Sequence, residues 1–167
     1  MTAPRIIDAT SANRLDEAAA IVFEYLAMTE GEVGRPVPRT PEELPPGLRP
    51  VVESIGTHYR RPGAVFLAVQ GDATIGCVGV VPVAEAGAGT VEVSRLYVRA
   101  AHRRRGIAAS LLRSAHAHAQ AHGFIRSVLT VMPSRTGAIA FYERLGYRVV
   151  PAAYPLAYDM VWLASTL

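Results

Sequence analysis

The chain has 167 residues, of which half are apolar and 19% are charged, and its formal net charge is +3. This length fits one domain, residues 1–167, that can bury a core without disulfides or metal ions. A surplus of three positive charges is too small for a nucleic-acid surface over a whole face, and no apolar run approaches the roughly 20 residues of a membrane helix. The N-terminus lacks the segments of a secretory signal, so we expect a soluble, cytoplasmic protein.

The single cysteine, Cys77, cannot form an internal disulfide. It lies within the apolar run 75–81, which is typical of a buried strand. Because free cysteine is among the most buried residue types, we interpret Cys77 as a core side chain rather than a catalytic thiol.

The chain begins with a strand, a helix and a proline-rich segment. Residues 5–8 have the pattern of a short strand, and apolar residues recur at helical spacing from about residue 11 to residue 26. Six prolines fall within residues 31–50, where they exclude long regular structure because proline removes a backbone donor and blocks the preceding turn. A short helix is predicted near residues 51–59.

A hairpin and a strand-loop-helix unit come next. Strand-forming residues occupy 64–69 and 74–83 around a polar turn, which predicts an antiparallel hairpin. Residues 90–98 form another predicted strand. The stretch 104–122 carries its apolar side chains on one helical stripe and is followed by Gly123, a residue type that favours helix termination.

The last third of the chain is predicted to contain a strand, a short helix and a final strand. We place them at residues 127–132, 137–145 and 157–163. Antiparallel strands followed by a β-α-β unit indicate an α/β fold with a mixed sheet.

The clearest functional motif is a basic, glycine-containing loop between the strand 90–98 and the helix that follows it. The loop consists of Arg103, Arg104, Arg105, Gly106, Ile107 and Ala108. Free amide groups at a helix N-terminus point at a bound anion, and the helix dipole favours negative charge there. Gly106 permits close backbone approach, and arginine adds charge-assisted contacts. The loop predicts a phosphate site; the alternative is an ordinary helix start with surface arginines.

These residues resemble the pyrophosphate loop of the GCN5-related N-acetyltransferase (GNAT) family, which reads Gln/Arg-x-x-Gly-x-Gly/Ala. Residues 92–98 and 109–112 are similar to the family's fourth strand and the helix after it, and residues 138–147 are similar to its late helix and tyrosine-bearing turn. The resemblance is strong over residues 75–150. It implies an α/β fold with a mixed, splayed sheet flanked by helices, in which acetyl-CoA lies as cosubstrate between two parting strands, with no metal.

The resemblance also implies which residues hold the coenzyme. Backbone groups of the fourth strand would bind the pantetheine arm, and the amides of the loop would bind the pyrophosphate. The cofactor-binding residues expected on this basis are Leu96, Tyr97, Val98, Arg103, Arg104, Arg105, Gly106, Ile107 and Ala108.

Two residues are candidates for catalysis. Tyr142 matches the family tyrosine that lies near the coenzyme sulfur and can protonate the departing thiolate; the alternative is a packed aromatic side chain on an amphipathic helix. Glu92 falls where some members place a general base, and a regular strand would put it on the same face as Leu96 and Val98. The alternative for Glu92 is a solvated carboxylate or a partner of Arg95.

Other features carry less functional information. Where many relatives have asparagine, this chain has Arg135, which we expect to reach the nucleotide phosphates instead. His118 and His122 are four residues apart on a predicted helix, but no third ligand is evident, so we interpret them as surface histidines. The aromatic residues are too scattered to indicate base stacking.

The leading hypothesis is an N-acetyltransferase that moves an acetyl group to a primary amine by direct attack in a ternary complex. The alternative is a noncatalytic acyl-CoA-binding or sensing domain. The sequence does not identify the acceptor, either a small-molecule or a peptide amine, and Glu24, Glu30 and Glu32 are interpreted as solvated charges rather than an amine site. Because the family often pairs through its late strands, we also expect a possible homodimer.

Overall fold

A seven-stranded mixed sheet organises the computed structural model, which describes residues 3–167. Its strand order is β1-β2-β3-β4-β5-β7-β6, and β4 with β5 is the one parallel pair within the described residues. The strands are β1 (Arg5–Asp8), β2 (Ala64–Gln70), β3 (Ala73–Pro82), β4 (Thr90–Val98), β5 (Arg126–Val131), β6 (Arg148–Val150) and β7 (Val161–Thr166).

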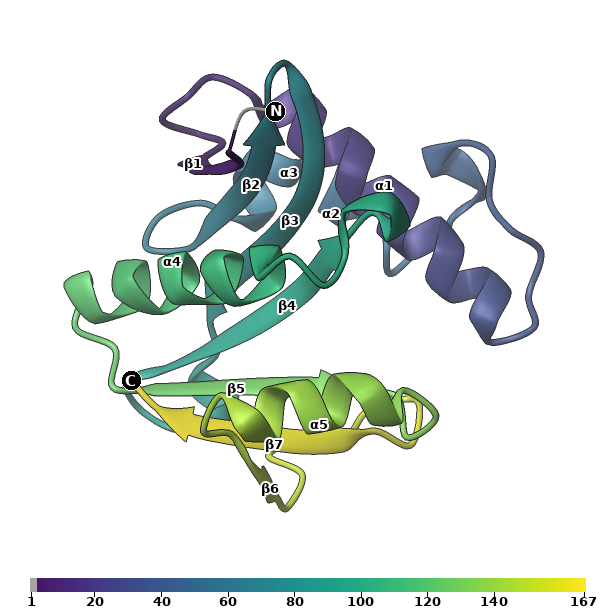
Figure 1. Cartoon of the computed structure of the whole chain (residues 1–167). Helices are drawn as coiled ribbons and strands as arrows, with labels where there is room; N and C mark the ends of the chain where they lie inside the picture. Colours follow the sequence, from purple (N-terminus) through teal and green to yellow (C-terminus); the bar gives the residue numbers. More distant parts are fainter. Residues whose placement is uncertain (1–2) are drawn as a thin grey trace.

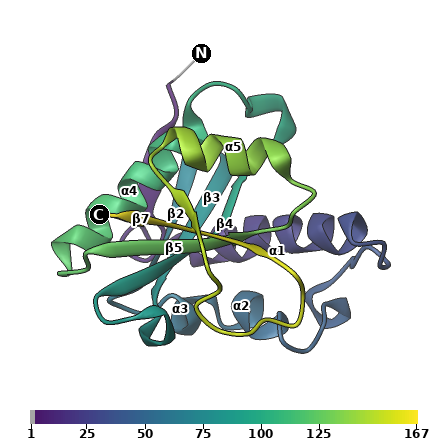
Figure 2. The ribbon, with the colours of Figure 1, turned by 90° about the horizontal axis from the view of Figure 1, so that it is seen from below.

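Helices cover both faces of the sheet (Figures 1 and 2). Helices α1 (Leu15–Glu32), α2 (Arg49–Glu53) and α3 (Ile55–His58) pack on one face, and α4 (Ile107–Ala121) and α5 (Thr136–Arg144) pack on the other. None of the helices in this described part combines the length and apolar character that crossing a bilayer requires.

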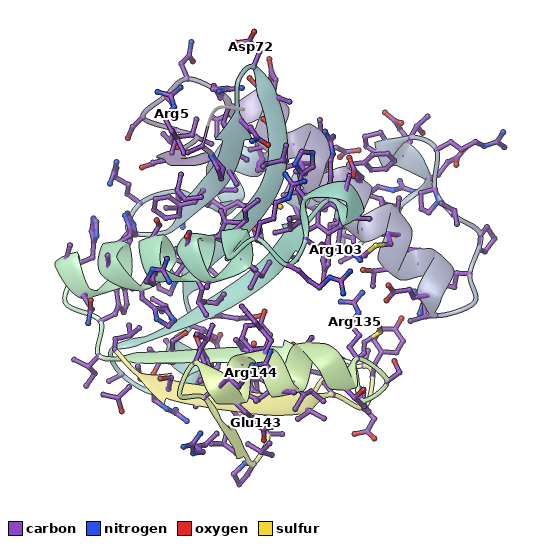
Figure 3. The ribbon with its side chains drawn as sticks, viewed as in Figure 1. Arg5, Asp72, Arg103, Arg135, Glu143 and Arg144 are labelled. Atoms are coloured by element: carbon purple, nitrogen blue, oxygen red, sulfur yellow. The ribbon has the colours of Figure 1, made fainter. Side chains whose placement is uncertain are left out.

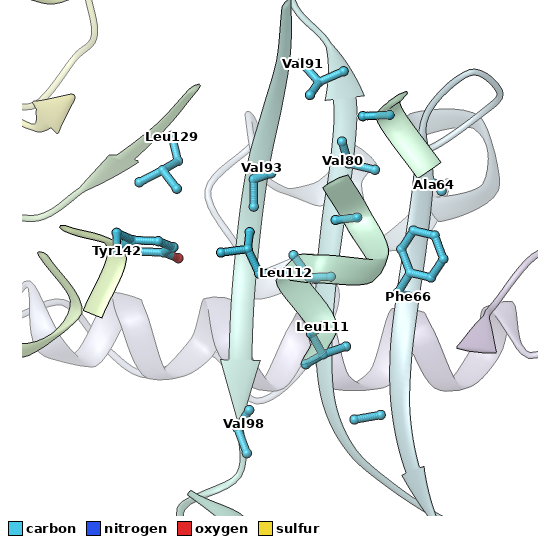
Figure 4. Close-up of a cluster of buried hydrophobic side chains, with 14 of the residues drawn as sticks. Ala64, Phe66, Val80, Val91, Val93, Val98, Leu111, Leu112, Leu129 and Tyr142 are labelled. Atoms are coloured by element: carbon cyan, nitrogen blue, oxygen red, sulfur yellow. The ribbon is translucent and has the colours of Figure 1, made fainter. Parts of the chain in front are cut away.

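Helix α4 shows why the sequence pattern folds as it does. The stripe predicted from the apolar spacing is buried against β2, β3 and β4, with Leu111 and Leu112 at 0% and 2% exposure. Figure 4 shows both leucines where the helix crosses the strands that carry Val80 and Val93. Truncating a leucine at such a site costs about 2–5 kcal/mol, so this stripe fixes α4, and with it the loop at its N-terminus.

The two central strands separate soon after they meet. Only three residue pairs join β4 to β5, and they run from Thr90 with Arg126 to Glu92 with Val128. Beyond Glu92 the strands diverge, as the two halves of the ribbon in Figure 1 show. The rest of β4 therefore has no strand partner on its β5 side, so its backbone groups can pair with an extended ligand.

A β-bulge interrupts β4 within this unpaired stretch. Ser94 lies opposite Gly79 and Tyr97 lies opposite Cys77, so Arg95 and Leu96 together face a single residue of β3. Arg95 has φ +55°, in the left-handed region that few side chains adopt. The extra residue reverses the alternation of faces along the strand.

Most predicted elements are confirmed, including the mixed α/β sheet, the hairpin of β2 and β3, and β4 at residues 90–98. The proline-rich segment contains only the short 3-10 helix η1 (Pro41–Glu43) before α2. At the end of the chain, one predicted boundary was wrong and one strand was missed. The final strand begins at Val161 rather than at residue 157, and β6 was not predicted because three residues carry too little periodicity to detect.

Candidate active site

Two cavities flank the unpaired half of β4. The first, the α5-side cavity, has a volume of about 410 Å³ and lies where β4, α4, α5 and the C-terminal half of α1 meet. It is lined by Tyr25, Met28, Glu32, Leu96, Tyr97, Val98, Arg103, Ala108, Arg135, Ala138, Phe141 and Tyr142.

The second, the α1-side cavity, is larger, with a volume of about 720 Å³. Its walls come from α1, the segment between α1 and α2, β4 around its bulge, the end of β5 and the loop before β7. It is lined by Tyr25, Leu26, Thr29, Glu30, Val33, Arg35, Leu48, Glu92, Val93, Ser94, Arg95, Thr130, Met132, Pro133, Ser134, Leu156, Ala157, Tyr158, Asp159 and Met160. Tyr25 is common to both cavities, so they meet at its side chain.

The basic loop curls into the N-terminus of α4 beside the α5-side cavity. Arg104 and Gly106 have φ values of +60° and +75°, and Gly106 is the N-cap residue, with no side chain capping the helix. The first amides of a helix have no partner within it, so those of Ile107 and Ala108 are available to a ligand. A Cβ atom built on Gly106 would meet nothing within 4 Å, so open space lies before this turn.

The arginines of the loop are placed differently from one another. Arg103 donates from Nε to the carbonyl oxygen of Val98 at 2.8 Å and lines the α5-side cavity. Arg104 and Arg105 are exposed and do not line that cavity. Figure 3 shows Arg103 reaching into the open end of the gap, towards Arg135.

Tyr142 projects from α5 towards β4 (Figure 4). Its side chain is 9% exposed and lines the α5-side cavity, yet within residues 3–167 its phenol oxygen makes no hydrogen bond. Burial raises the pKa of Tyr142 well above its usual range, and the nearby Tyr25 adds to this effect. The phenol therefore holds its proton at neutral pH and can donate it to an anion in the cavity.

Glu92 lies on the other side of the strand, in the α1-side cavity. Its Oε2 atom accepts a hydrogen bond of 3.1 Å from the phenol of Tyr154. The expectation that Glu92 shares a face with Leu96 and Val98 was wrong. Those two side chains pack with the core beneath α4, because the bulge at Arg95 reverses the alternation between Glu92 and them.

Arg135 joins the two halves of the sheet instead of facing the solvent. Its guanidinium donates to the Oε2 atom of Glu32 at 2.6 and 2.9 Å, and to the hydroxyls of Tyr25 and Thr29 at 3.0 Å each. The N–H groups of Arg135, which we expected to reach phosphates, therefore donate to side chains of α1. Arg135 instead clamps the start of α5 onto α1 across the gap.

Arginines pair with Glu24, Glu30 and Glu32 of α1, and the interpretation as a solvated charge was wrong for the buried Glu30, whereas the side chains of Glu24 and Glu32 stay 38% and 40% exposed. Glu24 accepts hydrogen bonds from Arg99 at 2.7–3.1 Å and from the phenol of Tyr97 at 2.8 Å. Glu30 is 5% exposed and pairs with Arg35, and Glu32 pairs with Arg135. These pairs fix α1 as the common wall of the two cavities.

Cys77 is fully buried, and burial raises the pKa of its thiol to about 12. This placement agrees with the interpretation of a core side chain, since a thiolate does not form there at neutral pH. His118 stacks on His122 and contacts the carbonyl oxygen of Pro62 through Nε2. Within residues 3–167, no three His, Cys, Asp or Glu side chains are grouped closely enough to hold a metal.

The arrangement of a splayed sheet with a basic loop at the N-terminus of α4 can be compared with known proteins. Residues 32–147 match the family model described as the acetyltransferase (GNAT) family. The chain belongs to this family. The match includes β4, the loop, α4 and α5, which line the α5-side cavity together with the C-terminal half of α1.

The chain is also similar in sequence to a curated relative, and it shares its fold with two solved structures. The rat protein N-acetyltransferase 8B is 29% identical over 104 residues, covering 61% of this chain, and the match spans about half, 46%, of that relative's length. A GNAT acetyltransferase from Staphylococcus aureus superposes with a TM-score of 0.76 at 17% identity, over 98% of this chain and 99% of the other. The PaiA N-acetyltransferase of Thermoplasma acidophilum, solved with coenzyme A, has a TM-score of 0.70 at 14% identity, over 99% and 100%.

Six of the residues expected to contact the coenzyme or the sulfur line the α5-side cavity. They are Leu96, Tyr97, Val98, Arg103, Ala108 and Tyr142. Arg104, Arg105, Gly106 and Ile107 lie outside its lining, and the side chain of Ile107 is part of the core. Sequence reasoning missed Tyr25 and Arg95, because an aromatic on an amphipathic helix and an arginine on a strand carry no local signal of a cavity.

Proposed function

We propose that this GNAT protein transfers an acetyl group from acetyl-CoA to a primary amine by direct attack in a ternary complex. The observation that carries the proposal is the pair of cavities that meet at Tyr25 beside the unpaired half of β4. One cavity contains the phenol of Tyr142, which has no hydrogen-bond partner among the described residues, and the other contains the carboxylate of Glu92. A thioester in the first and an amine in the second can approach each other there.

The α5-side cavity suits the coenzyme. The unpaired backbone of β4 at Leu96 to Val98 can hydrogen-bond the amides of a pantetheine arm as a neighbouring strand would. The amides at the start of α4 then face the pyrophosphate, where the helix dipole and Arg103 favour its negative charge. The solved relative with coenzyme A bound supports this assignment at the level of the fold.

The two candidate catalytic residues divide the proton transfers between them. The lone pair of the amine attacks the thioester carbonyl carbon, and collapse of the tetrahedral intermediate breaks the C–S bond. Tyr142 donates its phenolic proton to the departing thiolate, since its raised pKa keeps that proton available. Glu92 accepts the proton of the amine, directly or through water, because its carboxylate lines the cavity that takes the amine.

The test begins with the coenzyme alone. Calorimetry should detect acetyl-CoA binding without an amine, and the bound coenzyme should raise the melting temperature because only the native state assembles the site. No binding at millimolar acetyl-CoA would reject the proposal.

Thiol release and mass spectrometry over a panel of amines then test catalysis. Binding without acetylation of any amine would favour a noncatalytic acyl-CoA sensor.

We also propose a homodimer, although the strand order argues against pairing through the last strand of the chain. Strand β7 lies between β5 and β6, so the last strand of the chain is not an edge of the sheet. The edge strand next to β7 is β6, where Val149 is 58% exposed. Sedimentation at high micromolar concentration tests this association, and a monomer would count against it.

A further inference from the structure

An arginine without a carboxylate partner lies in the wall of the α1-side cavity. Arg95 is half-buried at the bulge of β4, and among residues 3–167 no Asp or Glu lies within 4.0 Å of its guanidinium. Its Nη1 atom donates to two neutral hydroxyls, Ser94 at 2.8 Å and Tyr59 at 3.4 Å. Its Nε atom is fully buried and has no acceptor.

This arrangement is unusual for a charge in an apolar setting. A buried donor without an acceptor is costly, and a partly buried cation generally has an anionic partner. Nine of the twenty residues that line the cavity are apolar, among them Leu26, Leu48, Val93 and Met132, and two more are tyrosines. The protein therefore supplies a guanidinium but not the anion that would complete its hydrogen bonds.

The other charges of the cavity do not neutralise Arg95. Glu30 is paired with Arg35, and the guanidinium of Arg35 also contacts Tyr158. Glu92 is hydrogen-bonded to Tyr154, and Asp159 is exposed on the loop before β7. With Glu30 and Arg35 paired, the cavity has two separate acidic groups and one unpaired cation at its β4 wall.

The backbone holds this guanidinium in place. Arg95 has a positive φ, a conformation that is unfavourable for an arginine and that the pairing of β3 with β4 imposes. Bulges re-aim side chains next to active sites. Tyr59 reinforces the position, because its ring lies directly on Gly79, where an added Cβ would be 2.2 Å from the ring.

We propose that Arg95 binds a carboxylate of the acceptor, so that the acceptor is an apolar molecule carrying both a primary amine and a carboxylate. An amino acid with a large apolar side chain has this chemistry. Its carboxylate would accept hydrogen bonds from the terminal nitrogens of the Arg95 guanidinium, its apolar body would pack on Leu26 and Val93, and its amine would lie towards Glu92. This inference rests on the proposed function, whose reaction it leaves unchanged.

The first experiment compares matched acceptors. Leucine and phenylalanine are tested against leucinamide and phenylalaninamide, which keep the shape and the amine but lack the charge. We expect kcat/KM to be about 10- to 100-fold higher for the carboxylates, the range of a charge-assisted hydrogen bond. Arg95→Met should abolish this preference, and Arg95→Lys should keep part of it because lysine retains the charge but not the fork.

Two further variants make the result interpretable. Arg113→Met removes the same charge from the exposed face of α4, where Arg113 donates a hydrogen bond to Ser110, and should keep the wild-type preference. Arg95→Gly removes the guanidinium while accepting the positive φ, so it tests the proposal if Arg95→Met fails to fold. Equal rates for acids and amides in the wild type, or an unchanged preference in Arg95→Met, would overturn the inference.

Binding of reaction products separates this inference from the proposed reaction. With coenzyme A present, calorimetry should show that N-acetylleucine binds about 10- to 100-fold more tightly than N-acetylleucinamide, and that Arg95→Met removes the difference. Such binding without turnover of any amine would support the carboxylate site and contradict the proposed reaction. Turnover of amines without any preference for carboxylates would do the reverse.

Discussion

Removing the hydroxyl of Tyr142 should separate catalysis from stability. In Tyr142→Phe the ring keeps its contacts with Phe141 and Tyr147, whose centroids lie 5.3 and 5.5 Å away. Because the phenol has no hydrogen-bond partner among residues 3–167, its loss should change the free energy of unfolding by less than about 1 kcal/mol. Loss of a general acid should lower kcat about 10²-fold, which corresponds to about 2.7 kcal/mol of activation free energy.

Tyr147→Phe is the matched control. Its hydroxyl hydrogen-bonds Ser127 and His116 at 2.7 Å each, and both Tyr147 and Ser127 are completely buried. This variant should lose about 1–3 kcal/mol of unfolding free energy and keep the wild-type kcat, since Tyr147 does not line either cavity. Urea unfolding measures the free energy of unfolding, calorimetry measures the affinity for coenzyme A, and thiol-release kinetics measure kcat. A wild-type kcat in Tyr142→Phe would refute the reasoning.

Three further predictions concern the base, the loop and the pH dependence of folding. Glu92→Gln should lower the rate chiefly at pH values where the amine is protonated, with partial recovery at higher pH; a wild-type pH profile would make Glu92 structural. Gly106→Val should weaken coenzyme binding in calorimetry, because valine disfavours the positive φ and fills the open space before the turn; unchanged affinity in a folded variant would place the phosphates elsewhere. Burial lowers the pKa of His116 below its unfolded value of about 6.5, so its contribution to stability is full above that value and is lost as the pH falls towards the folded pKa. Lowering the pH from 7.5 to 5.5 should therefore reduce the free energy of unfolding less in His116→Gln than in the wild type. Part of the reduction should persist in the variant, because His58 and His118 also have lowered pKa values. An equal reduction in both proteins would contradict the assignment to His116.

The fold was largely predictable because its signals are local. The apolar stripe of α4 and the alternation of β2 and β3 can each be read within a short window of sequence, and both elements are present. The loop 103–108 was likewise predictable, since a glycine and a basic run at a helix start are adjacent in the chain.

The details of the site depend on contacts between distant parts of the chain. The face of Glu92 could not be predicted because the bulge at Arg95 is visible only in the pairing of β3 with β4. The clamp of Arg135 joins residues separated by more than a hundred positions, and no pattern near Arg135 indicates Glu32. Tertiary packing decides which partner a charged side chain pairs with, and a single sequence does not show that packing.

The meeting of the two cavities at Tyr25 has a consequence for how such a chain can diverge. Among residues 3–167, Tyr25 is the one side chain that lines both cavities. Apart from Thr29, whose hydroxyl accepts a hydrogen bond from Arg135, substitutions in the other walls of the α1-side cavity can therefore select new acceptors without replacing a residue that lines the α5-side cavity. Several of those walls are loops, between α1 and α2 and before β7, which tolerate replacement and insertion. Acceptor range and coenzyme affinity can thus evolve independently over most of these walls, whereas one substitution at Tyr25 or Thr29 changes both cavities.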